Sequence, residues 1–182
     1  MYIERALEPL VRRYSENFKI VAVTGPRQVG KTTMLKHLME EEAESGVDRV
    51  YVTLDNTAIL QTAKEDPALF LQRYRPPVLI DEIQKAPELL PYIKMIVDER
   101  DDCGSVWITG SQPLHLMKAV SESLAGRVGI VEMLGLSHSE VAGTPSEPYL
   151  PSADYFMRRV DTAKPFGVSE AYRQICAGSL PG

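Results

Sequence analysis

Short apolar runs, rich in β-branched residues, recur along the chain between longer segments of mixed polarity. Runs of this kind are typical of strands that a parallel sheet buries on both faces. Five strands are therefore expected, at residues 19–24, 50–54, 77–80, 105–109 and 128–133.

The segments between these runs carry apolar residues at the three- and four-residue spacing of an amphipathic helix. A first helix is expected from Ile3 to Tyr14, ahead of the first strand. Residues 57–75 predict a helix in two pieces, broken near Asp66 and Pro67. Further helices are expected at residues 34–42, 87–99, 116–124 and 165–178.

The alternation of strands and helices predicts an α/β fold, with a mainly parallel sheet, right-handed crossovers and helices on both faces. Ligands of such sheets bind beyond the carboxyl ends of the strands. Residues 25–32, the pair Asp81 and Glu82, and residues 109–112 follow three of the expected strands. We therefore expect these segments to lie together at one edge of the sheet.

The first of these segments, residues 25–32, reads GPRQVGKT and matches the whole phosphate-binding pattern G-x-x-x-x-G-K-S/T. Glycines allow the tight backbone turn, and the loop N–H groups bind phosphate oxygens at the start of the following helix. A glycine-rich turn that merely opens a helix is the alternative. The strand before the loop and the helix after it favour a nucleoside triphosphate site.

Each position of this loop has an expected role. Lys31 is expected to reach the β- and γ-phosphates, and the Thr32 hydroxyl to bind Mg²⁺. No N/T-K-x-D guanine motif is present, which favours ATP. The expected nucleotide-binding residues are Gly25, Pro26, Arg27, Gln28, Val29, Gly30, Lys31, Thr32 and Thr33.

Two adjacent acids follow the third strand, about fifty residues after the loop lysine. An aspartate in this position of phosphate-loop enzymes holds the Mg²⁺ ion. Asp81 is therefore the expected metal ligand beside Thr32. Glu82 is the expected catalytic base that orients water, because neighbouring side chains on a strand point in different directions.

Three more polar positions are candidates with open alternatives. Thr109, Ser111 or Gln112 is expected to sense the γ-phosphate if the fourth strand lies between the first and the third; Ser111 as a helix N-cap is the alternative. Arg127 is either an arginine finger supplied by a neighbouring subunit or a partner in a surface salt bridge. Arg27 is expected to touch the γ-phosphate or to pair with Glu82.

Composition excludes several other classes of protein. The 182 residues carry a net charge of −5, which gives no general attraction to nucleic acid. Two distant cysteines predict neither a disulfide framework nor a metal site. No apolar run approaches a membrane span and no signal core opens the chain, so a cytoplasmic location is expected.

Four motifs together resemble one family, the prokaryotic AAA-type ATPases whose N-terminal ATPase domain precedes a poorly characterised C-terminal domain. The motifs are TGPRQVGKTT (24–33), LIDEIQKAP (79–87), ITGSQ (108–112) and SESLAGR (121–127). The resemblance covers about residues 2–142. It implies a three-layer P-loop NTPase sandwich with strand order 5-1-4-3-2, Mg-ATP hydrolysis, a sensor within residues 109–112 and Arg127 as a finger candidate.

The chain is thus expected to consist of an ATPase domain, residues 1–143, and a linker with the start of a truncated C-terminal region, residues 144–182. The expected function is to couple ATP binding and hydrolysis to that region, in a chain that forms a homo-oligomer if Arg127 is a finger. A nucleotide-binding switch with negligible hydrolysis and a DNA-associated ATPase are the alternatives. A small-molecule kinase has no acceptor site in its favour.

Overall fold

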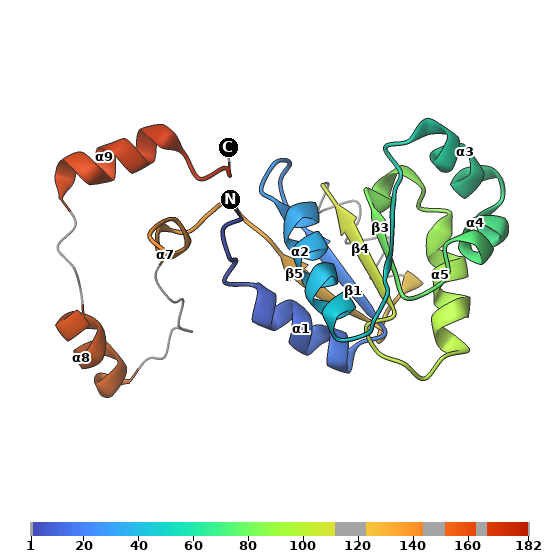
Figure 1. The fold of residues 1–182 in the computed structure, drawn as a ribbon, viewed down its shortest axis with the longest axis horizontal. Helices are drawn as coiled ribbons and strands as arrows, with labels where there is room; N and C mark the ends of the chain where they lie inside the picture. The colour runs from blue at the N-terminus through green and yellow to red at the C-terminus, as the bar shows by residue number, and fades with distance from the viewer. Residues whose placement is uncertain (1, 112–122, 144–151, 163–166, 182) are drawn as a thin grey trace.

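The computed structural model describes residues 2–111, 123–143, 152–162 and 167–181. Its centre is a five-stranded parallel sheet (Figure 1). The order β2-β3-β4-β1-β5 confirms the expected arrangement, read from the other edge. The strands are β1 (Ile20–Thr24), β2 (Val50–Thr53), β3 (Val78–Asp81), β4 (Val106–Gly110) and β5 (Val128–Glu132).

The sheet separates two apolar cores, because successive side chains of a strand point to opposite faces. In β1, Ile20 and Ala22 belong to one core, whereas Val21 and Val23 belong to the other. All five residues of β1 are buried, which explains why its sequence is continuously apolar rather than alternating.

Helices cover both faces of the sheet (Figure 1). One core lies under α1 (Glu8–Asn17) and α2 (Lys31–Glu44). The other lies under a second group: α3 (Thr57–Glu65), α4 (Pro67–Arg73) and α5 (Leu89–Asp98). The break predicted near Asp66 is confirmed, since its side chain caps α4 by accepting a hydrogen bond from Leu69 N at 2.9 Å.

Some helix predictions were wrong or incomplete. The first helix begins at Glu8 rather than Ile3, because Pro9 belongs in a first turn, where its missing N–H costs nothing. Two helices were not expected, α7 (His138–Val141) and α8 (Ala153–Thr162). The helix expected at residues 116–124 lies almost wholly outside the described residues.

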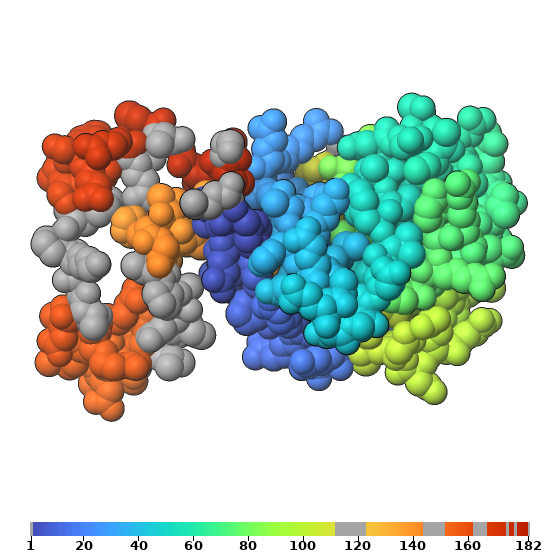
Figure 2. Space-filling model, in the orientation of Figure 1, coloured from blue at the N-terminus to red at the C-terminus, as the bar shows by residue number. Residues whose placement is uncertain are grey.

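The chain continues beyond the sheet into α7, α8 and α9 (Val168–Ala177), the last within the expected 165–178. Figure 2 shows α8 and α9 apart from the body made by the sheet and its helices. A hydrogen bond of 2.6 Å from Leu136 N to Ser179 O returns the last described residues to the segment after β5. Among the helices described, none has the length and apolar composition needed to cross a bilayer.

Candidate functional site

The loop between β1 and α2 turns where its glycines allow it. Gly25 and Gly30 have φ of 142° and 92°, in a region that side chains disfavour. A Cβ at Gly25 would lie 2.0 Å from the carbonyl oxygen of Met133, so no other residue fits there. The loop therefore packs directly against the chain that follows β5.

Lys31 points back into the loop. Its side chain is 6% exposed, and Nζ donates hydrogen bonds to Gly25 O at 3.0 Å and Pro26 O at 2.6 Å. Burial lowers the pKa of Lys31, while the charges of Glu82 and Asp81 oppose that shift. A buried ammonium held by these two carbonyl dipoles is well placed to exchange them for the anionic oxygens of a phosphate.

Asp81 ends β3 beside this loop and is 6% exposed. Its Oδ1 accepts hydrogen bonds from Thr32 Oγ1 at 2.8 Å and from Thr109 Oγ1. Its Oδ2 accepts one from Tyr51 OH at 3.1 Å. Three strands and the start of α2 thus hold one carboxylate in a fixed orientation.

The chemistry of Thr32 and Asp81 fits a magnesium ion. Mg²⁺ prefers oxygen ligands, which a hydroxyl and a carboxylate supply. The Thr32 hydroxyl donates a hydrogen bond of 2.8 Å to Asp81 Oδ1, so these two oxygens lie side by side at the loop. The site thus offers two protein ligands of the type that Mg²⁺ uses together with substrate phosphates and water.

The Glu82 side chain contacts different groups from the Asp81 side chain, because Glu82 follows the end of β3 in a left-handed turn. Its backbone is left-handed, with φ of 60°, and its N–H donates to Thr109 Oγ1 at 3.2 Å. Its Oε2 accepts a hydrogen bond from Ser111 Oγ at 3.2 Å and another from Gln84 Nε2. The left-handed turn therefore directs the carboxylate toward the end of β4.

The fourth strand lies between β1 and β3, the arrangement on which the sensor prediction depended. It places Thr109 on Asp81 and Ser111 on Glu82, so both hydroxyls lie within the acidic cluster. Gln112 and the residues that Ser111 would cap lie outside the described part of the chain.

Two polar side chains at this site were not predicted. Tyr51 reaches Asp81 because β2 pairs with β3. Which strands pair is decided by the tertiary fold and cannot be read from the local sequence. Gln84 donates to both Glu82 and Ser111. Within the described residues its Oε1 is buried and meets no hydrogen-bond donor. Burial and the charge of Asp81 raise the pKa of Tyr51 to about 12.

Neither arginine candidate contacts Glu82 among the described residues. Arg27 is exposed on the loop, and the described contacts of Glu82 are with Gln84 and Ser111 instead. Arg127 precedes β5, whose first residue is level with Ile20, at the opposite end of β1 from the loop. It forms an ion pair with Asp98, the surface salt bridge that was its alternative role. Within this structure Arg127 and the loop therefore lie at opposite ends of β1.

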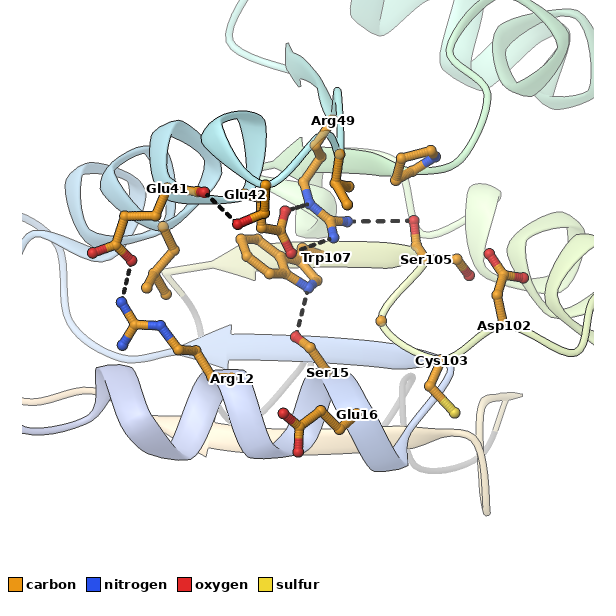
Figure 3. Close-up of a pocket in the computed structure, with 15 residues that line it drawn as sticks. Arg12, Ser15, Glu16, Glu41, Glu42, Arg49, Asp102, Cys103, Ser105 and Trp107 are labelled. Carbon is orange, nitrogen blue, oxygen red and sulfur yellow. Dashed lines mark hydrogen bonds and ion pairs between the residues drawn. The ribbon is translucent and has the colours of Figure 1, made fainter.

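A cavity of about 510 Å³ lies at that opposite edge (Figure 3). It is lined by residues of α1 and α2 and by residues that precede β2 and β4, including Arg49 and Ser105. The Arg49 guanidinium stacks 3.8 Å above the ring of Trp107 and pairs with Glu42, while Trp107 Nε1 donates to Ser15 Oγ at 3.0 Å. These polar groups satisfy one another, so packing accounts for them without a ligand.

Most of this sequence is similar to a known protein family and to proteins of other organisms. Residues 17–142 match the model of a family described as "AAA domain". Uncharacterized proteins of Mycobacterium tuberculosis and Mycobacterium bovis are 33% identical over 137 residues, covering 75% of this chain and 30% of theirs. The chain therefore spans less than a third of the length of these curated relatives.

Solved structures share the fold at low identity. DnaA from Aquifex aeolicus, bound to AMPPCP, aligns with a TM-score of 0.53 at 15% identity, over 97% of this chain and 62% of that one. Domain III of the replication initiation protein DnaA from Thermotoga maritima gives 0.53 at 13%, over 99% and 95%. The DnaC helicase loader gives 0.50 at 14%, over 73% and 94%.

Proposed function

Because the chain belongs to the AAA domain family, we propose that it binds Mg-ATP on the loop of residues 25–33 and hydrolyses it. The observation that carries the proposal is the meeting of a buried lysine and two acids at one edge of the sheet. Lys31 begins α2, whereas Asp81 ends β3 and Glu82 directly follows it.

In this proposal the loop N–H groups and Lys31 bind the β- and γ-phosphates. Thr32 and Asp81 hold Mg²⁺, which would neutralise the charge that develops on the phosphate oxygens. Glu82 orients the attacking water for in-line displacement and takes up its proton. Ser111 holds one oxygen of Glu82 and leaves the other for that water.

The nucleotide is proposed to be ATP because the sequence lacks the guanine motif. The test is equilibrium binding of ATP and GTP, with and without Mg²⁺. ATP should bind at least tenfold more tightly than GTP, and Lys31→Ala should abolish the binding. Lys64→Ala is the control, because Lys64 is an exposed lysine in the last turn of α3. Unchanged binding in Lys31→Ala would contradict the proposed phosphate site.

Arg127 is proposed to act only between subunits, since its own chain holds it at the far edge of the sheet. Turnover per subunit should then rise with protein concentration, and Arg127→Ala should abolish that rise. Turnover independent of concentration would leave Arg127 as half of a surface ion pair with Asp98.

Residues 144–182 are proposed to belong to the region that responds to nucleotide state. What supports this is the greater length of the relatives, in which 137 matched residues make up only 30% of the protein. A switch that binds ATP without hydrolysing it is distinguished by measurable affinity with no phosphate release.

A further inference from the structure

Arg5 is the most heavily bonded side chain beside the loop. It is 5% exposed, although it precedes the first helix and carries a full charge. Its Nη1 donates to Val29 O at 2.7 Å, and its Nη2 donates to Leu134 O at 2.9 Å and Gly135 O at 3.3 Å. Its Nε donates to Glu140 Oε1 at 2.9 Å. One guanidinium therefore joins the loop to the segment after β5.

The bond to Val29 fixes the orientation of a peptide group in the loop. In a trans peptide unit the carbonyl and the following N–H point in opposite directions. Because Arg5 holds the Val29 carbonyl, the N–H of Gly30 must point away from Arg5. Gly30 has φ of 92° and directly precedes Lys31. Arg5 thus sets the direction of one N–H donor beside the lysine that is expected to bind phosphate.

Glu140, the carboxylate that accepts from Arg5, is also held by several hydrogen bonds. Glu140 Oε1 also accepts from Ala6 N at 2.8 Å, and Oε2 accepts from Ser137 N at 2.6 Å, which closes a capping box on α7. Burial would raise the pKa of Glu140, but the hydrogen bonds from Ser137, Ala6 and Arg5 hold it below its ordinary value. Glu140 is therefore a carboxylate that binds Arg5 and α7 together.

We propose that Arg5 is a positioning residue for the phosphate loop, and that its pair with Glu140 transmits nucleotide binding to residues 134–142. This inference rests on the proposed function, because it requires that the loop bind a triphosphate. A phosphate that binds the Gly30 N–H pulls on the same peptide group whose Val29 carbonyl Arg5 holds. Arg5 follows that carbonyl, and α7 follows Arg5 through Glu140.

A second ion pair, made by another buried arginine, provides the comparison. Arg49 and Glu42 form an ion pair of 2.8 Å at the opposite edge of the sheet, where Arg49 packs on Trp107. Loss of that pair removes the same kind of interaction far from the loop. If Arg5 serves packing alone, Arg5→Lys and Arg49→Lys should have similar consequences for nucleotide binding.

The first test measures the affinity for Mg-ATP and the thermal midpoint of Arg5→Lys and Arg49→Lys. Lysine keeps the charge but cannot make the forked contacts of a guanidinium. Arg5→Lys should weaken Mg-ATP binding at least tenfold, whereas Arg49→Lys should change it less than twofold, whatever either does to the midpoint. Equal affinities in the two variants would overturn the positioning role.

The second test measures hydrogen exchange of residues 134–142 with and without a non-hydrolysable ATP analogue. The wild-type amides should exchange several-fold more slowly with the analogue bound. Glu140→Ala should lose this response while still binding the analogue. Ser137→Ala is the control, because it weakens the cap of α7 without touching Arg5, and it should keep the response.

The outcomes separate the two proposals. A wild-type chain that does not bind the analogue contradicts the proposed function itself. A chain that binds it with no change of exchange in residues 134–142 overturns the transmission alone. Loss of the response in both Glu140→Ala and Ser137→Ala would also overturn it, because the stability of α7 would then explain the effect.

Discussion

The hydrogen bond between Tyr51 and Asp81 can be tested by removing a single oxygen atom. Tyr51→Phe removes the hydroxyl that donates to Asp81 Oδ2 at 3.1 Å and leaves the ring in place. Asp81 keeps its two hydrogen bonds on Oδ1, from Thr32 and Thr109. The variant therefore releases one oxygen of a buried carboxylate without removing apolar bulk.

The size of the effect follows from the burial of Asp81. A hydrogen bond to a charged group contributes about 1.5–3 kcal/mol to stability, and water replaces it poorly at a carboxylate that is 6% exposed. Tyr51 itself is partly exposed, so we expect a loss of about 1–2 kcal/mol. For a chain of this length, that loss lowers the thermal midpoint by about 2–8 °C.

The assays are urea denaturation and binding of Mg-ATP. The midpoint of unfolding should fall with an unchanged m-value. The dissociation constant for Mg-ATP should rise about three- to tenfold, because a freer Asp81 must be ordered again when the metal binds. Tyr92→Phe, on the exposed face of α5, is the control and should change neither quantity. Wild-type stability and Mg-ATP affinity in Tyr51→Phe would refute the claim that Tyr51 positions Asp81.

Three further predictions concern the loop, the same tyrosine and the opposite edge of the sheet. In Lys31→Ala, ATP affinity should fall at least a hundredfold in calorimetry, while the circular dichroism spectrum stays that of the wild type. Because the pKa of Tyr51 is raised to about 12, the unfolded chain loses this proton first, so stability should fall between about pH 10 and pH 12. Tyr51→Phe should show a smaller loss in that pH window, and an identical loss would contradict the assignment. Trp107→Phe should cost about 1–3 kcal/mol in urea titration, because it removes the bond to Ser15 and part of the surface under Arg49, without changing ATP affinity.

Local patterns were sufficient to predict the sheet and the loop. The strands are continuous apolar runs, and the glycines of the loop occupy left-handed or otherwise restricted positions that sequence alone marks. The capping box that begins α7 is also a local signal in the sequence, Ser137 followed three residues later by Glu140. Pro9 likewise marked the start of α1.

Contacts between distant segments were beyond the reach of the sequence. Tyr51 meets Asp81 only because β2 and β3 are paired in one register, Thr53 beside Asp81. The contacts of Arg5 likewise arise only in the folded chain. Its bonds to Val29 and Glu140 depend on where the chain runs after β5. No periodicity of residues 1–10 contains that information.

The most direct test of the account is phosphate release from Mg-ATP by the wild-type chain and by Glu82→Gln, with ATP binding measured on the same samples. Glu99→Gln, an exposed acid at the end of α5, serves as the control. The account predicts that all three bind ATP and that Glu82→Gln alone loses turnover, by at least a hundredfold. Undiminished phosphate release by Glu82→Gln would contradict the assignment of Glu82 as the catalytic base.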